Sequence, residues 1–142
     1  MNREELKQIL PHREPMLLLD TVEKQAENGE EIAIGAYQVR GEEWFLQGHF
    51  PENPIVPGVI QCEILAQSVC VLLTGALKPG CVPMYTGMKQ VKFRNPVRPG
   101  DLFQTRCKIT RSHPPFYFAE GKGYVGETLC IEAEFSFAVV EQ

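Results

Sequence analysis

The chain has 142 residues, of which 44% are hydrophobic and 23% charged, and this balance predicts one packed domain over residues 1–142. The net charge of -4 gives no support to a nucleic-acid partner, because binding to phosphates needs a basic face. The five cysteines contain no CxxC pair, which argues against a zinc site and a disulfide framework. The N-terminus MNREELKQIL lacks the apolar stretch of a secretory signal, so a reducing, cytoplasmic setting is the simplest interpretation.

Six segments have the composition of β-strands, with alternating or continuous apolar residues between turn signals. They cover residues 16–24, 31–39, 84–94, 101–112, 115–124 and 128–140. The pair Asn28-Gly29 separates the first two strands and is typical of a tight hairpin turn. A short helix over about residues 3–9 is expected before them, since Asn2 and Glu5 have the spacing of a capping box.

A long helix is predicted from Pro57 to about residue 77, directly after a glycine- and proline-rich loop over residues 40–56. The helical stretch PGVIQCEILAQSVCVLLTGAL has no charged face, and a helix that is apolar nearly all round is buried. A membrane span would need a similar length, but one glutamate and two glutamines argue against it. We therefore expect an α+β fold, in which an antiparallel sheet surrounds one buried helix.

Glu63 is the only carboxylate of this helix, and its position suggests chemistry. Unpaired glutamates are almost never fully buried, and desolvation raises the pKa of a carboxyl. A glutamate that is protonated near neutral pH can act as a general acid. Gln67 lies four residues on and shares its face, so its amide could hydrogen-bond Glu63. His49, in the preceding loop, is a candidate general base.

The helix start at Pro57-Gly58-Val59 supplies a third component. Free N–H groups and the positive end of the helix dipole suit a developing negative charge. Gly58 has no side chain, so a carbonyl oxygen could approach its N–H closely. A base, an acid and an oxyanion donor suit proton removal next to a carbonyl, followed by loss of a protonated group. The structural alternatives are a glutamate paired with a lysine, a histidine bound to backbone and a glycine required by helix geometry alone.

Four stretches of the chain resemble, in the same order, the signature of the 3-hydroxyacyl-[acyl-carrier-protein] dehydratases of type II fatty acid synthesis. The resemblance is to the broad-chain-length branch with a catalytic glutamate. The stretches are LPHREPMLLLD (10–20), GHFPENPIVPGVIQCEILAQ (48–67), KFRNPVRPGD (92–101) and IEAEFSF (131–137). Together they span nearly the whole chain. Departures from the pattern, at Met16, Glu52, Cys62 and residues 85–90, do not fall on the predicted acid, base or oxyanion donor.

The resemblance implies a hotdog fold, a curved antiparallel sheet around one long central helix, as a single domain. It also implies an obligate homodimer, stacked into a trimer of dimers, with the active site between two protomers. His49 of one protomer and Glu63 of the other would be the catalytic base and acid, and the Gly58 N–H would polarise a thioester carbonyl. The substrate would arrive on the phosphopantetheine of acyl carrier protein, without a metal, a bound cofactor or a membrane.

Two further groups of residues follow from the resemblance. The residues expected to bind substrate are Phe50, Pro57, Val59 and Gln67. A basic run in this otherwise acidic chain would dock the acidic carrier protein, and its members are Lys89, Lys92, Arg94 and Arg98. A solvated strand face is the plainer interpretation of these charges. Strict alternation along residues 84–94 puts Lys92 and Arg94 on one face and Lys89 on the other.

Three other functions stay open at this point. A hotdog acyl thioesterase activates water with a helix carboxylate and does not need the GHFP histidine. Sequence motifs scarcely distinguish a simple dehydratase from one that also isomerises its 2-enoyl product to a 3-enoyl one. A non-catalytic acyl-binding subunit has no need of the acid–base pair. The sequence also allows Glu63 to act directly or through a water, and it predicts structural roles in turns for His12 and His113.

Overall fold

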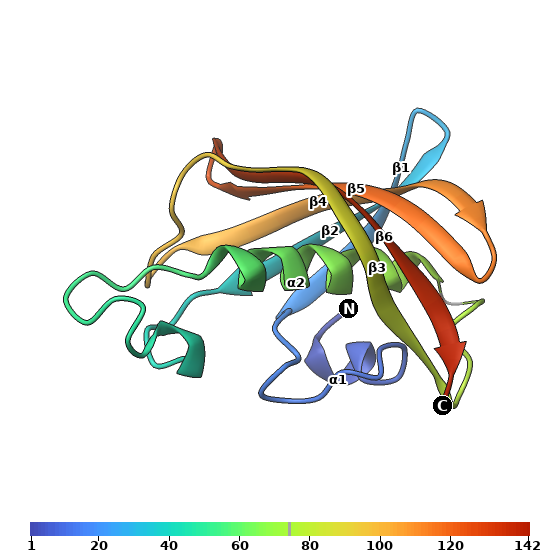
Figure 1. Ribbon diagram of the computed structural model, residues 1–142, viewed down its shortest axis with the longest axis horizontal. Coiled ribbons are helices and arrows are strands. Elements are labelled where there is room, and N and C mark those ends of the chain that lie inside the picture. Colours follow the sequence, from blue (N-terminus) through green and yellow to red (C-terminus); the bar gives the residue numbers. More distant parts are fainter. Residues whose placement is uncertain (74) are drawn as a thin grey trace.

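The computed structural model contains the whole chain and describes every residue except residue 74. Its six antiparallel strands form one sheet in the order β1-β2-β4-β5-β6-β3, and this sheet curves around helix α2 (Figure 1). The strands are β1 Thr21–Glu27, β2 Glu30–Gln38, β3 Cys81–Phe93, β4 Leu102–His113, β5 Phe116–Val125 and β6 Thr128–Glu141. The helical elements are α1 Arg3–Leu6, η1 Trp44–Leu46, α2 Gly58–Cys70 and η2 Val71–Leu73. The expected α+β hotdog fold is confirmed.

Local signals place most of these elements correctly. Asn28 and Gly29 have φ angles of 52° and 78°, the geometry of a two-residue turn that matches the twist of the hairpin β1–β2. Asn2 caps α1 in a capping box with Glu5, as its spacing predicts. The α1 helix itself ends at Leu6, short of the expected residue 9, and turns continue the chain from there.

The predicted strand over residues 16–24 is wrong in its first half, because β1 begins only at Thr21. The apolar run before it is buried but has no strand partner. Its backbone groups are used by a side chain of α2: the Leu18 N–H donates to Gln67 Oε1 at 3.0 Å, and the Met16 carbonyl accepts from Gln67 Nε2 at 2.7 Å. This segment is therefore a buried connection fastened to the central helix.

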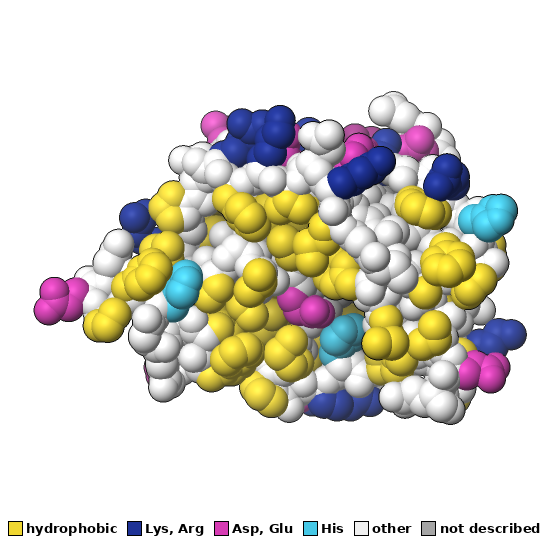
Figure 2. Space-filling view, viewed as in Figure 1, with side chains coloured by type: hydrophobic (Ala, Val, Ile, Leu, Met, Phe, Trp, Pro, Cys, Tyr) yellow, Lys and Arg dark blue, Asp and Glu magenta, His cyan; other side chains and the backbone are white. Residues whose placement is uncertain are grey.

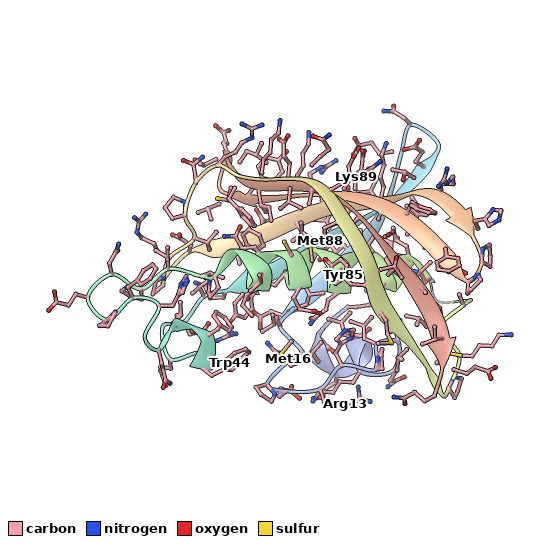
Figure 3. The ribbon with its side chains drawn as sticks, viewed as in Figure 1. Arg13, Met16, Trp44, Tyr85, Met88 and Lys89 are labelled. Carbon is pink, nitrogen blue, oxygen red and sulfur yellow. The ribbon has the colours of Figure 1, made fainter. Side chains whose placement is uncertain are left out.

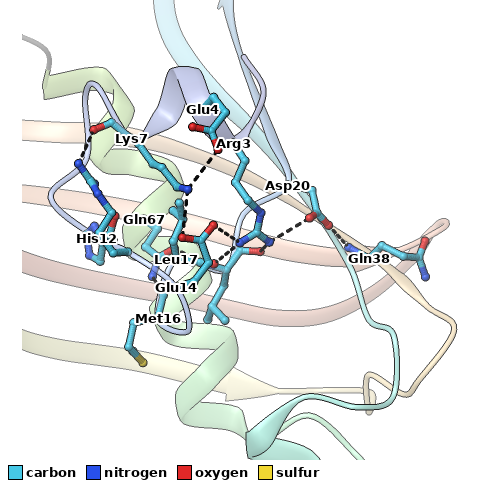
Figure 4. A network of polar contacts seen from close by, with 12 residues as sticks. Arg3, Glu4, Lys7, His12, Glu14, Met16, Leu17, Asp20, Gln38 and Gln67 are labelled. Carbon is cyan, nitrogen blue, oxygen red and sulfur yellow. Dashed lines mark hydrogen bonds and ion pairs between the residues drawn. The ribbon is translucent and has the colours of Figure 1, made fainter.

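An ion-pair network holds the other side of this segment (Figure 4). Arg3 donates to the Leu17 carbonyl at 2.7 Å and to the Asp20 carboxylate at 3.0 Å. Lys7 pairs with Glu14 at 3.1 Å. The N-terminal residues are thus tied to the entrance of β1, and they cover one side of α2.

The α2 helix ends at Cys70 and continues as the short η2, so the predicted helix to residue 77 is too long. Residue 74, within that predicted helix, lies outside the described part of the chain.

A close contact joins α2 to the sheet. Ser68 Oγ lies 2.7 Å from Thr105 Oγ1 of β4, which also accepts the Gly35 N–H at 3.0 Å. A Cβ on Gly35 would lie 2.6 Å from Thr105 Oγ1, so the absent side chain permits this close helix–sheet contact. No helix within residues 1–73 and 75–142 could cross a bilayer.

Candidate functional site

His49 and Gly58 line one pocket of about 500 Å³ at the N-terminal end of α2. His49 Nδ1 lies 3.0 Å from the Ile55 carbonyl oxygen. Because a carbonyl can only accept, Nδ1 carries a proton, and in the neutral ring the free lone pair is then on Nε2. The histidine ring also stacks on Phe50, with ring centroids 4.4 Å apart. The loop therefore presents an oriented imidazole with one nitrogen free to act as a base.

Gly58 is the first residue of α2, directly after the N-cap Pro57. A Cβ at this position would lie 2.7 Å from the Phe93 ring, so this ring packs directly against the bare backbone of Gly58. The backbone N–H groups of Gly58 and Val59 donate to no acceptor among the residues that the structure describes. Two free N–H groups at a helix N-terminus beside His49 form a site for a developing oxyanion.

Glu63 projects from the middle of α2 and its side chain is 24% exposed. Gln67 Nε2 donates to Glu63 Oε2 at 3.0 Å, which confirms the expected pairing of these two residues. Burial raises the pKa of Glu63 above its ordinary value, and the hydrogen bond from Gln67 only partly opposes this shift. The carboxyl is thus biased toward its protonated form, as a general acid requires.

Gln67 is fully buried, and its amide makes three hydrogen bonds, to Glu63 and to the backbone of Met16 and Leu18. Its donors are both used, so the side chain is fixed in one orientation. The structure thus gives Gln67 a positioning contact with the acid, while its predicted contact with substrate stays a prediction.

His12 is the residue that sequence reasoning missed. Its Nε2 lies 3.6 Å from Glu63 Oε2, and its Nδ1 is buried without a hydrogen-bond partner among the described residues. Burial, together with the neighbouring Arg13 guanidinium, lowers the pKa of His12, so the imidazole is neutral near pH 7. No local pattern indicates this contact, because it joins distant parts of the chain. The only available signal was the LPHR stretch within the family resemblance.

His49 and Glu63 are not brought together within one protomer. Glu63 does not line the pocket that contains His49 and Gly58. The surface around these groups is apolar, and hydrophobic side chains gather over α2 and β3 with acidic and histidine side chains among them (Figure 2). The large exposed apolar residues on these elements and the adjoining loop are Phe50, Val59, Met84, Met88 and Phe93. A single protomer thus presents each half of the acid–base pair on an apolar face.

The basic run does not follow strict alternation. In the sheet, Lys89 of β3 lies opposite Glu134 of β6, and Lys92 lies opposite Glu132, with a shift in the strand register between the two positions. Gln90, at a φ of 55°, lies within this bulge, which inserts an extra residue and reverses the alternation. Lys89 and Lys92 therefore share the outer face of the sheet, and the prediction that they lie on opposite faces is wrong. Figure 3 shows Lys89 on the side of the sheet away from α2.

Arg94 lies next to the candidate site, directly after the end of β3. Its guanidinium pairs with Glu132 at 3.2 Å and lowers the pKa of that carboxyl. The same residue also lines the His49 pocket. Arg98 is exposed nearby, and its backbone N–H donates to Asp101 at 2.8 Å. Of the four predicted docking residues, Arg94 alone lines the pocket, while Lys89 and Lys92 lie opposite Glu134 and Glu132 on the outer sheet.

Solved structures share this architecture. The dehydratase heterocomplex ApeI:P from Xenorhabdus doucetiae has a TM-score of 0.81 at 17% identity, covering 96% of this chain and 91% of that chain. A probable thioesterase from Bartonella henselae has a TM-score of 0.62 at 14% identity, covering 78% and 91%. At such identities the likeness shows the fold alone, and that fold is one used by both dehydratases and thioesterases.

Sequence comparison resolves the class. The model of the FabA-like domain matches residues 10–134. The 3-hydroxyacyl-[acyl-carrier-protein] dehydratase FabZ of Natranaerobius thermophilus is 39% identical over 139 residues, covering 97% of this chain and 96% of the relative. FabZ of Clostridium beijerinckii is 40% identical over 142 residues, covering 98% and 99%. The chain therefore belongs to the FabA-like domain family and, within it, to the FabZ group of 3-hydroxyacyl-[acyl-carrier-protein] dehydratases.

The raised pKa of Glu63 predicts a pH-dependent stability difference. A carboxyl whose folded pKa lies above its unfolded value stabilises the fold below the unfolded pKa, and this contribution is lost as pH rises through the folded pKa. The uncharged Glu63→Gln variant avoids that loss. Its melting temperature should exceed that of the wild type at about pH 8, and the gap should close toward about pH 4.

Circular dichroism melts across this pH range measure the difference. Glu23→Gln, which removes an exposed carboxylate from β1, is the matched control. A stability gap that widens on acidification would contradict the assignment of Glu63 as a carboxyl biased toward protonation.

Proposed function

We propose that this chain acts as the dehydratase that its family membership indicates. It converts 3-hydroxyacyl-[acyl-carrier-protein] to trans-2-enoyl-[acyl-carrier-protein] and water during fatty acid elongation, which makes it a hydro-lyase. The observation that carries this proposal is the opposed chemistry of Glu63 and His49. One is a carboxyl whose pKa burial raises, and the other is an imidazole whose Nε2 is free. Dehydration needs an acid and a base of these two kinds.

The proton transfers follow from this arrangement. His49 Nε2 takes the proton from C2 of the acyl chain, while the Gly58 N–H stabilises the negative charge that develops on the thioester oxygen. Glu63 gives its proton to the 3-hydroxyl, so the C3–O bond breaks and water leaves. The electron pair of the C2–H bond forms the C2=C3 double bond. Transfer of one proton from His49 back to Glu63 restores the starting state.

A second copy of the chain completes this site. Three features support the assembly: Glu63 lies outside the His49 pocket, the surface around both is apolar, and β3 is an edge strand of 13 residues. An unpaired strand edge of this length is suited to pairing with another copy. We propose that His49 of one protomer faces Glu63 of its partner, and that three such dimers stack, as the family resemblance implies.

The remaining assignments extend the same proposal. Phe50, Pro57 and Val59 border the N-terminal end of α2, where the thioester would lie. The substrate is carried on the phosphopantetheine of acyl carrier protein, and the side chains named above move every proton without a metal or bound cofactor. The setting is the cytoplasm. Acyl carrier protein is acidic, and it would dock on Lys89, Lys92, Arg94 and Arg98, of which Arg94 lines the pocket.

The reaction is tested with a crotonyl thioester of N-acetylcysteamine, by following the ultraviolet absorbance of the enoyl thioester. Wild type should interconvert it with the 3-hydroxybutyryl form. Glu63→Gln and His49→Ala should each lower kcat by about 10²- to 10⁴-fold, the usual contribution of a general acid or base.

Two variants control for the loss of a carboxylate and a histidine elsewhere on the surface. Glu52→Gln changes the loop next to His49, and His113→Ala changes an exposed residue at the end of β4. Both should retain activity. Release of free thiol without hydration would instead assign the chain as a thioesterase.

Charge reversal tests the docking face. Arg98→Glu should raise the KM for a carrier-bound substrate about tenfold, because it places a negative charge against an acidic partner. The kcat on the N-acetylcysteamine thioester should not change. Added salt should narrow the difference in KM between the variant and the wild type on the carrier-bound substrate. Lys24→Glu, an exposed position on β1, is the matched control. Equal effects of the two variants would exclude docking through Arg98.

A further inference from the structure

Gln61 is a buried polar residue without a structural explanation. It lies on α2 three residues after Gly58 and is only 4% exposed. Its Oε1 atom is sealed from solvent and has no hydrogen-bond partner among the described residues. Nearly all buried polar groups in proteins are paired, and an unpaired amide oxygen costs stability. Its neighbours along the helix, Ile60 and Ile64, are aliphatic, so packing alone would favour an aliphatic residue here.

The open end of this amide faces the candidate site. Gln61 lines the same pocket as His49 and Gly58. Because Oε1 is the sealed atom, Nε2 is the end of the side chain that reaches the pocket. Residues three apart lie on one face of a helix, so Gln61 lies about one turn after Gly58 on the same face. Both residues carry hydrogen-bond donors, and both line the same pocket.

The second glutamine of α2 provides the contrast. Gln67 is as deeply buried, but its amide is engaged with Leu18, Met16 and Glu63. Gln67 is therefore explained by the contacts it makes within the chain. Gln61 makes none of this kind in the described structure, which leaves its donor available to a molecule that enters the pocket.

We propose that Gln61 contacts the substrate, donating from Nε2 to the thioester carbonyl oxygen beside the Gly58 N–H. This inference rests on the proposed dehydration. When His49 removes the C2 proton, negative charge moves onto that oxygen, which has lone pairs for two donors. The same pocket is lined by Phe93 and Pro96 together with the polar Arg94 and Asn95, and a donor already in place where charge develops stabilises the transition state. Gln61 would thus be retained for turnover at a cost in stability.

Two substitutions separate the donor from the volume of the side chain. Gln61→Met keeps the length and removes the amide, while Gln61→Glu keeps the shape, removes the donor and adds negative charge. Hydration of the crotonyl thioester of N-acetylcysteamine gives kcat and KM, and thermal melts give stability. Gln61→Met should lower kcat at least about tenfold, with a smaller change in KM, and should raise the melting temperature. Gln61→Glu should lower kcat further.

Ser68→Ala is the matched control on the same helix. Ser68 is fully buried, lies away from the pocket and has both of its hydroxyl contacts, to Ile64 and Thr105. Its loss should lower the melting temperature and leave kcat unchanged, the reverse of the Gln61→Met result.

The outcomes distinguish this inference from the proposed function. If wild type does not interconvert the two thioesters, the dehydration proposal fails and the role of Gln61 fails with it. If wild type is active and Gln61→Met retains its kcat, Gln61 does not contact the reacting oxygen. If Gln61→Met melts at a lower temperature or dissociates into monomers, the residue serves the fold or the subunit interface instead, and the inference is overturned.

Discussion

The structure of the site depends on the buried amide of Gln67. It hydrogen-bonds the backbone at Met16 and Leu18 and also the carboxyl of Glu63. One side chain therefore fixes both the segment that covers α2 and the orientation of the acid. The same segment carries His12 to within 3.6 Å of Glu63. Because a buried amide that loses a partner is costly, these positions depend on one another, and a change in the N-terminal segment would reach the Glu63 carboxyl.

Burial affects the middle of α2 more than its N-terminal end. In the middle of the helix it raises the pKa of Glu63 and so prepares an acid. At the helix N-terminus the Gly58 N–H has no acceptor among the described residues and shares a pocket with His49, whose Nδ1 contacts the Ile55 carbonyl. The predicted acid and base thus lie in different surroundings of one loop–helix unit: Glu63 on the buried helix and His49 in the loop before it. Within the protomer the two groups lie apart, and an apolar face surrounds both of them.

Sequence patterns predict the elements of this fold where the cause is local. The Asn28-Gly29 turn and the uncharged stretch of α2 are such cases. Sequence patterns fail where contacts between distant residues determine the structure. The apolar run from Met16 hydrogen-bonds a helix side chain instead of a neighbouring strand, and the bulge at Gln90 reverses the alternation of side chains along β3. His49, Gly58 and Glu63 were predicted from local features: a lone carboxylate in an uncharged helix, a histidine in the preceding loop and a glycine at the helix start. The family resemblance added the expectation that two protomers share the site. His12 and Gln61 needed coordinates, because their significance lies in a contact across the chain and in a missing partner.

The central claim, that two protomers share each site, is tested by co-expressing His49→Ala with Glu63→Gln under separate affinity tags. Each variant alone should be inactive. In a mixed dimer one site loses both groups and the other keeps His49 from one protomer and Glu63 from its partner. With random pairing, about a quarter of wild-type activity should return, since half of the dimers are mixed and each has one complete site. Mixed dimers, isolated through both tags, that remain inactive would contradict the account and place the acid and base within one protomer.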